Sequence, residues 1–176
     1  MAINKGYLTA KTDKASDEVY TPAYAVRPIL KYLKPNSTIW CPFDTEDSEF
    51  VKVFMAAGHK VTYSHIDTEQ NFFTYEPKED YNYIISNPPF SIKDAILQRL
   101  TELNKPYAML LPLPTLQGQK RFNYLQGSQA LIFDKRINFF KDYQTKEIQK
   151  GISFATIYIC KGFLPKDLIF EKIDIA

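Results

Sequence analysis

The fold and chemistry of this chain centre on one stretch, YNYIISNPPF (residues 81–90). An apolar run rich in β-forming residues ends abruptly at Asn87-Pro88-Pro89-Phe90. Proline donates no backbone N–H, so a sheet ladder cannot continue through this tetrapeptide, and each proline keeps the residue before it extended. The pattern predicts a strand that ends in a stiff loop presenting one amide side chain, two carbonyls and one aromatic ring.

These groups suit the activation of a planar amine. The exocyclic amino group of a nucleobase is a poor nucleophile, because its lone pair is delocalised into the ring. The Asn87 side-chain oxygen and the Pro88 carbonyl oxygen can accept hydrogen bonds from both N–H groups, which frees the lone pair on nitrogen. The Phe90 ring can stack on a base swung out of its helix. The alternative is an ordinary strand-to-helix turn, in which Asn and Pro are common.

On these residues the chain resembles the amino-methyltransferases that use S-adenosylmethionine, and especially the N6-adenine DNA methyltransferases. Asn87-Pro88-Pro89-Phe90 matches their catalytic motif. The same tetrapeptide also occurs in rRNA guanine-N2 methyltransferases and, with Tyr for Phe, in glutamine methyltransferases. The resemblance therefore implies methyl transfer from S-adenosylmethionine to adenine N6 in DNA, with RNA or a protein glutamine as alternative substrates.

Length and composition predict one globular domain. The chain has 176 residues and 45% apolar content, and we expect residues 17–176 to fold behind a flexible, polar lead over residues 1–16. The start lacks an apolar signal-peptide region, and no run reaches membrane-spanning length. Cys41 and Cys160 are isolated in apolar segments, which indicates reduced thiols in a cytoplasmic protein. Two histidines and no paired cysteines argue against a zinc site.

Charge is unevenly distributed along the chain. Residues 44–80 hold nine acids and three bases, whereas residues 93–167 hold twelve bases and six acids. The basic half suits contacts with the phosphates of DNA or RNA. The acidic half suits a cationic sulfonium cofactor, although carboxylates are also favoured at the start of a helix.

Strand-like and helix-like segments alternate, which predicts a doubly wound α/β sheet. The resemblance implies a Rossmann-like class I methyltransferase sheet of seven strands, mostly parallel with the last one antiparallel, in a minimal form without a separate target-recognition domain. The expected strands cover residues 37–41, 61–64, 81–86, 107–112, 130–134 and 152–160.

Three helices are expected from apolar positions at helical spacing. Thr21 is a plausible N-cap for the first, with Pro22 in its first turn and Pro28 kinking or shortening it. Asp47 or Ser48 caps the second helix and Gly58 ends it, while Ser91 caps the third.

The resemblance also implies two groups of cofactor contacts near the first helix and the first strand. In the family, the loop after the first strand reads Asp-Pro-Phe, followed by a small residue and a glycine pair. This chain has no glycine there, and Cys41 replaces the acid, so Asp44 is expected to contact the cofactor's ammonium group. The residues carried over are Tyr20, Thr21 and Pro22 at the methionine end, with Cys41, Pro42, Phe43 and Asp44 in the loop.

Further cofactor contacts are expected after the second strand. Family members place an acid at the end of that strand to hold both ribose hydroxyls, and the candidates here are His65 and Asp67. The alternative for His65 is a structural role, which is common for a lone histidine beside a strand. Asn71, Phe72 and Phe73 resemble the family's segment that reads the adenine amino group and packs on its ring.

Two basic segments are candidates for touching nucleic acid. Lys120 and Arg121 lie among aromatic residues in 116–124, a mixture that suits single strands or flipped bases. Lys135 and Arg136 open a long, basic and aromatic connection between two expected strands. The alternatives are an amphipathic helix resting on the core and a solvated hairpin loop.

A DNA adenine methyltransferase normally carries a target-recognition region of many tens of residues, for which this chain has no room. Either the basic segments give loose specificity, or a protein partner supplies recognition, and the compact length is typical of a phage or mobile-element enzyme. A second hypothesis is a catalytically idle methyltransferase-like module that binds nucleic acid or a protein. The glycine-free cofactor loop favours that alternative.

Overall fold

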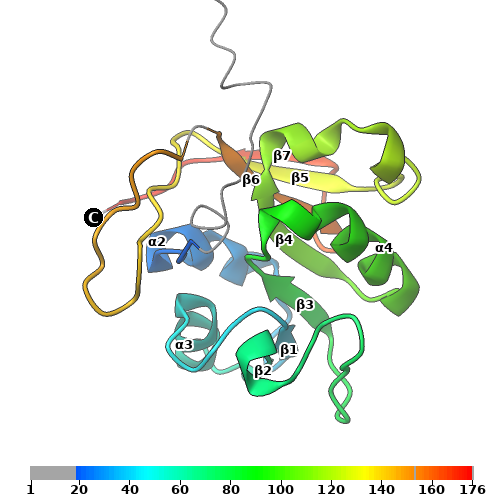
Figure 1. The fold of residues 1–176 in the computed structure, drawn as a ribbon, viewed down its shortest axis with the longest axis horizontal. Coiled ribbons are helices and arrows are strands. Elements are labelled where there is room, and N and C mark those ends of the chain that lie inside the picture. The colour runs from blue at the N-terminus through cyan, green and yellow to red at the C-terminus, as the bar shows by residue number, and fades with distance from the viewer. Residues whose placement is uncertain (1–18, 153, 176) are drawn as a thin grey trace, which may run out of the picture.

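The computed structural model of the chain describes residues 19–152 and 154–175, and within them the strands form one seven-stranded sheet (Figure 1). The expected lead, residues 1–16, lies outside the described residues. The strands are β1 (Thr38–Cys41), β2 (Lys60–Tyr63), β3 (Tyr83–Ser86), β4 (Tyr107–Pro112), β5 (Gln129–Phe133), β6 (Thr156–Lys161) and β7 (Leu168–Glu171).

The helices of the described residues are short. The α-helices are α2 (Ala23–Val26), α3 (Glu49–Ala56) and α4 (Lys93–Leu103). Tighter 3₁₀ turns are η2 (Arg27–Tyr32), η3 (Ile66–Thr68), η4 (Phe90–Ile92), η5 (Leu113–Leu116) and η6 (Gln119–Arg121).

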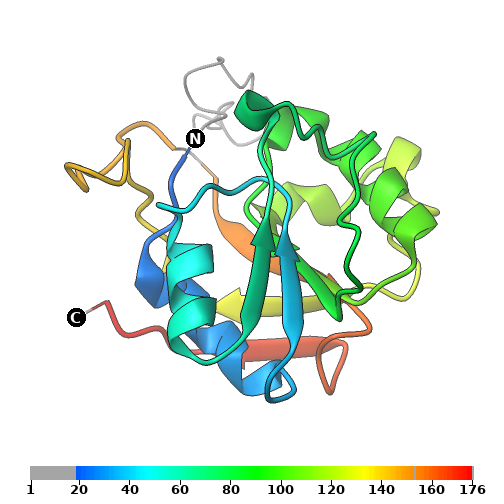
Figure 2. The same cartoon turned by 90° about the horizontal axis from the view of Figure 1, so that it is seen from below.

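The sheet is mostly parallel, as expected for an α/β protein. Its strand order is β2-β1-β3-β4-β6-β5-β7, and β1 pairs in parallel with both β2 and β3. The carboxyl ends of these strands therefore meet at one edge of the sheet, where the arrowheads of β1 and β3 point in Figure 2. Such an architecture is compatible with a Rossmann-like fold.

The last of the strands expected from the sequence, residues 152–160, is antiparallel as predicted, but it is not the last strand of the sheet. The antiparallel strand is β6, which lies between β4 and β5 and pairs antiparallel with both. A further strand, β7, follows it and pairs in parallel with β5 at the sheet edge. Four residues carry too little pattern to predict this strand, and they become a strand only because β5 offers a free edge.

Helices cover both faces of the sheet. In Figures 1 and 2, α2 and α3 lie on one face and α4 lies on the other. Large side chains fill the core between these layers, and the fully buried ones include Trp40, Phe50, Tyr107 and Tyr158. None of the helices in the described residues is long and apolar enough to cross a membrane.

Two of the expected helix starts were wrong. Pro22, not Thr21, occupies the cap position of α2, and no side chain caps it. The helix continues as the 3₁₀ turn η2 at Arg27, because Pro28 cannot supply an α-helical N–H. The third helix begins at Lys93 rather than after Ser91, since residues 90–92 form η4 first.

The second helix start and the central loop match expectation. Ser48 caps α3 by accepting a hydrogen bond from the Phe50 N–H at 3.2 Å. The strand β3 ends at Ser86, and the Asn-Pro-Pro segment after it leads directly into η4. The strand β6 begins at Thr156, later than expected from residue 152.

Tyr158 ties the sheet to the helix layer. Its ring lies in the core on β6, and its hydroxyl donates to the Ala25 carbonyl at 2.9 Å. We expect Tyr158→Phe to lower the free energy of unfolding by about 1–2 kcal/mol, because the buried carbonyl loses its partner. Urea denaturation measures this. Tyr63→Phe, at an exposed position, is the matched control, and equal stability of both variants would contradict the assigned role.

Candidate active site

A cavity of about 340 Å³ opens at the carboxyl edge of the sheet. Its walls come from the loops that follow β1, β2 and β3, from residues 19–20 and from residues 143–144. The chain runs from β1 to β2 on one side and then crosses to β3 on the other side of β1. This reversal makes the β1/β3 boundary the topological switch point, where α/β sheets bind ligands.

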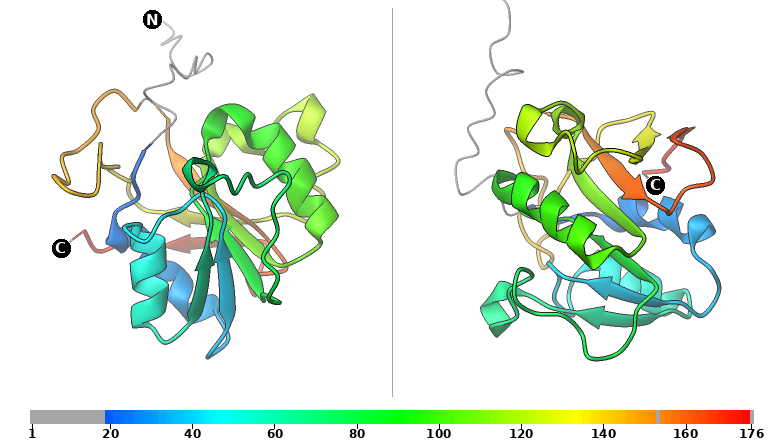
Figure 3. Two further views of the ribbon diagram at one scale, coloured as in Figure 1. Left: turned by 60° about the horizontal axis from the view of Figure 1, so that its bottom comes forward. Right: turned by 90° about the vertical axis from the view of Figure 1, so that its right-hand side faces the viewer.

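Most of the residues expected to bind a cofactor line this one cavity. They come from four separate segments, which Figure 3 shows converging above the strand ends. The lining members are Tyr20, Pro42, Phe43, Asp44, His65, Asp67, Asn71, Phe72 and Phe73, joined by Asn87 and Pro89 of the central motif. Five predicted residues are buried beside the cavity and do not line it: Thr21, Pro22, Cys41, Pro88 and Phe90.

Asp44 is the buried charge of the cavity. It accepts hydrogen bonds from the hydroxyls of Ser48 and Ser86, and only 5% of it is exposed. Burial raises the pKa of its carboxyl to about 6, although the two serine hydroxyls and the nearby His65 oppose the rise. The carboxylate is thus held in place and ionised at neutral pH, ready to face a cationic group.

The connection between β5 and β6 closes one side of the cavity, which sequence reasoning missed. Phe140 in this connection exchanges backbone hydrogen bonds of 3.1 and 2.8 Å with Tyr20. The Tyr143 ring then packs edge-on against Tyr20, with centroids 4.7 Å apart, and its hydroxyl donates to Ser48 at 3.2 Å. Tyr143 and Gln144 consequently line the cavity. An isolated tyrosine in a long loop carried no signal of this contact.

Asn87 presents an unpaired acceptor. Its side-chain Nδ2 donates to the Val19 carbonyl at 2.9 Å, which sets the orientation of the amide. The opposite atom, Oδ1, is buried and has no hydrogen-bond partner among residues 19–152 and 154–175. A buried acceptor without a partner costs about 1–3 kcal/mol. Asn87 itself lines the cavity, so a donor on a molecule bound there would satisfy this acceptor.

The Phe90 ring is not at the cavity surface, where stacking on a base was expected. It is 1% exposed and packs edge-on against Phe154 with ring centroids 5.4 Å apart. The turn η4 starts at this residue and directs it into the core. Phe73 is an aromatic side chain that both lines the cavity and is exposed, at 37%.

The segment after β2 forms a small aromatic wall. The Phe72 ring lies 4.9 Å from Phe43, joining the loops after β1 and β2. The Asn71 side-chain oxygen accepts from the Phe73 N–H at 3.0 Å, which holds this turn. The His65 Nδ1 accepts from the Asp67 N–H at 3.2 Å and so caps η3. This bond gives the histidine a structural role and leaves its other ring nitrogen for a ligand.

The charge of the cavity is negative. Three carboxylates line it, those of Asp44, Asp47 and Asp67. Among the described residues, no lysine or arginine lines it. Phosphate-binding sites rely on Lys, Arg or a helix N-terminus reached through glycines. The cavity therefore favours a cationic or neutral ligand over a nucleoside phosphate.

The four basic residues expected to touch nucleic acid lie outside this cavity. Arg121 is committed to structure: its Nε lies 2.5 Å from the Asp94 carboxylate, and its guanidinium also donates to the Gln117 carbonyl. Lys120 is exposed beside it on η6. Lys135 and Arg136 are exposed at the start of the β5–β6 connection.

The described residues contain no cluster of metal-ligating side chains. Across the described residues, no three or more His, Cys, Asp or Glu side chains form a group that could hold a metal ion. Cys41 and Cys160 are free and buried, and burial raises the pKa of both thiols. Both thiols are therefore protonated at neutral pH.

The raised pKa of Asp44 predicts a pH-dependent stability. Its folded-state pKa of about 6 lies above the ordinary 3.8, so the folded protein binds the proton more tightly than the unfolded chain. The stability contributed by this group is present below about pH 4 and is lost as the pH rises through 6. Relative to wild type, we expect Asp44→Asn to be more stable at pH 7, by up to about 3 kcal/mol, and equally stable near pH 4. Urea titrations at several pH values test this, and a constant difference would contradict it.

No protein-family model matches this chain, and no curated protein matches it either. Its function is therefore inferred from the cavity and the residues that line it.

Proposed function

We propose that the protein is an S-adenosylmethionine-dependent methyltransferase that acts on the exocyclic N6 amino group of adenine in DNA. The observation that carries this proposal is the buried, unpaired Oδ1 of Asn87, at a cavity on the switch point of a parallel sheet. The motif Asn87-Pro88-Pro89-Phe90 leads from a strand end into a turn, as the resemblance requires. In this proposal the sheet is a variant of the class I methyltransferase sheet, in which six strands correspond to those expected from the sequence and β7 is the seventh.

The acid-lined part of the cavity suits the cofactor. When bound, S-adenosylmethionine supplies an electrophilic methyl group on a sulfonium centre. Asp44 would face its ammonium group, because this carboxylate is buried and held by two serines. The contacting rings of Phe43 and Phe72 would form one apolar wall for its adenine ring. The net negative lining fits a ligand that carries positive charge and no phosphate.

Asn87 would orient and polarise the substrate amine. Its Oδ1 accepts one amino proton while the Val19 carbonyl holds the other end of the amide, so the acceptor is preorganised. The Pro88 carbonyl is the second expected acceptor, reached once the amine has entered. Orientation and hydrogen bonding then lower the barrier without a covalent intermediate on the protein.

A second candidate is an idle methyltransferase-like module that binds nucleic acid or a protein without catalysis. Two observations favour it: the loop from Cys41 to Glu46 has no glycine, and Phe90 is buried away from the cavity. RNA and a protein glutamine are alternative substrates for the same site. Mass spectrometry of nucleosides and peptides from cells expressing the chain separates these cases, because it names the modified group directly. The proposal places the protein in the cytoplasm, where buried thiols stay reduced.

Substitution of Asn87 tests the catalytic role. We expect Asn87→Ala to lower methyl transfer by at least about 100-fold, since a preorganised hydrogen bond to the reacting group is lost. The affinity for S-adenosylmethionine, measured by calorimetry, should change little. A tritiated-methyl assay on adenine-containing DNA measures the transfer. Asn123→Ala, at an exposed amide outside the cavity, is the control, and retained activity of Asn87→Ala would refute the assignment.

Substitution of Asp44 tests the cofactor site. We expect Asp44→Asn to weaken S-adenosylmethionine binding about tenfold or more, because a charge-assisted contact is lost. Wild-type affinity should also fall as the pH drops below about 6, where the Asp44 carboxyl becomes protonated. Glu102→Gln, on the exposed face of α4, is the control. No detectable binding by wild type in calorimetry would favour the idle module.

A further inference from the structure

A second, smaller cavity lies within the connection between β5 and β6. It has a volume of about 170 Å³ and is lined by residues from the two arms of this connection, 136–139 and 149–152. The Gln149 N–H bonds to the Phe139 carbonyl at 2.8 Å, and the Arg136 guanidinium donates to the Ile152 carbonyl at 3.1 Å. These bonds hold the arms together at two points. We call this space the Arg136 cavity.

Three polar residues line the Arg136 cavity: Arg136, Asn138 and Gln149, whose side-chain amide donates to the Lys150 carbonyl at 3.1 Å. Gly151 and three apolar residues complete the lining of the cavity. No carboxylate lines it among the described residues. A guanidinium beside amide groups suits an anion with several acceptor oxygens, because Arg offers its donors in a planar fork.

The positive charge around this cavity is not neutralised. Two cations of the connection pair with carboxylates: Lys141 with Glu147 at 3.0 Å and Lys146 with Glu49 at 3.9 Å. Within the described part of the chain, no carboxylate pairs with any of the other three, which are Lys135, Arg136 and Lys150. An anionic ligand would supply the missing counter-charge.

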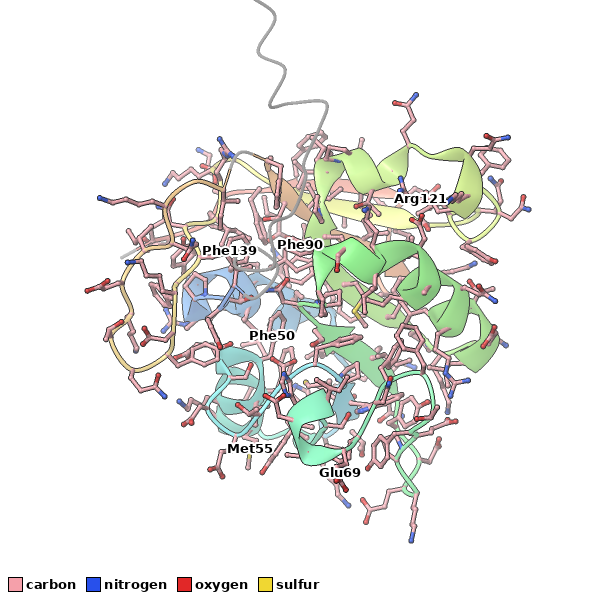
Figure 4. All side chains as sticks on the ribbon, viewed as in Figure 1. Phe50, Met55, Glu69, Phe90, Arg121 and Phe139 are labelled. Atoms are coloured by element: carbon pink, nitrogen blue, oxygen red, sulfur yellow. The ribbon has the colours of Figure 1, made fainter. Side chains whose placement is uncertain are left out.

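The location of the Arg136 cavity connects it to the proposed active site. The same connection supplies Tyr143 and Gln144 to the first cavity, and β5 and β6 place its ends at the carboxyl edge of the sheet. The other basic candidate, Arg121, is tied to Asp94 and lies on the far side of Phe90 from Phe139 (Figure 4). The β5–β6 connection therefore offers cations that pair with no described carboxylate, although Arg136 donates to the Ile152 carbonyl and Lys135 to the Ile173 carbonyl.

We infer that the Arg136 cavity binds a backbone phosphate of the nucleic acid strand whose target base enters the first cavity. This inference rests on the proposed function and adds a phosphate subsite to it. The acidic first cavity takes the uncharged base and the cationic cofactor, while the polyanionic backbone is held away from its carboxylates. One loop thus contributes to both sites and sets the position of the strand relative to Asn87.

The test measures binding of a short fluorescent single-stranded DNA by anisotropy at several salt concentrations, with no cofactor present. We expect Asn138→Asp to weaken binding about tenfold or more, because it places a carboxylate of the same shape beside the phosphate. Asn138 is exposed, so the variant should keep its fold, which circular dichroism checks. Arg136→Ala should weaken binding similarly and reduce the slope of log affinity against log salt by about 0.7.

Lys166→Ala is the matched control. It removes one positive charge from an exposed lysine between β6 and β7, at the opposite edge of the sheet, and should leave the affinity nearly unchanged. Equal losses for Arg136→Ala and Lys166→Ala, or no loss for Arg136→Ala and Asn138→Asp, would overturn the inference. Wild type that does not bind the DNA would overturn it as well.

Two further measurements separate a backbone-phosphate subsite from a free-anion site and DNA binding from methyl transfer. Inorganic phosphate that displaces the DNA at an equal concentration of phosphate groups would identify a free-anion site and overturn the backbone assignment. A weak effect of inorganic phosphate supports it. Methyl transfer is measured separately: DNA binding that depends on Arg136 in a protein without transferase activity would uphold the phosphate subsite and remove the proposed reaction.

Discussion

The hydrogen bond from the Ser86 hydroxyl to the Asp44 carboxylate joins the two halves of the candidate site. Ser86 is the last residue of β3 and stands directly before Asn87, whereas Asp44 lies in the loop after β1. Because β1 and β3 are parallel neighbours, their carboxyl ends bring these loops to the same place. This bond is possible only in that register, and it sets the carboxylate beside the amide that we propose acts on the substrate.

Burial of Asp44 has opposite effects on stability and on the proposed function. A carboxylate removed from water is costly even with two serine donors, and its raised pKa records that cost. The same burial makes it a strong partner for a cation that enters the cavity. The unpaired Oδ1 of Asn87 follows the same pattern, since a group left unsatisfied in the free protein is available to a ligand. A buried carboxylate and a buried amide oxygen without a described partner, both on residues that line one cavity, are thus the chemical case for a ligand site.

The connection between β5 and β6 contributes to the cavity in a way that the sequence did not predict. Its Phe140 forms paired backbone hydrogen bonds with Tyr20, and the hydroxyl of its Tyr143 donates to Ser48. The cavity is therefore assembled from segments that are spread over residues 19–144. The position of β7 at the sheet edge is a second feature of the same half, and both arise from pairings between segments far apart in sequence.

Sequence by itself determined the local features of this protein: the end of β3 at an Asn-Pro-Pro loop, the cap of α3 at Ser48 and a mostly parallel α/β sheet. These depend on proline geometry, capping hydroxyls and apolar periodicity, which act over a few residues. Sequence also indicated most of the residues that gather at the first cavity, through a motif resemblance. Only the tertiary structure decided that Phe90 is buried, that Arg121 is paired with Asp94, that β7 pairs with β5 and that Tyr143 lines the cavity. Each of these depends on which distant segment packs against the residue, and short-range patterns do not encode that.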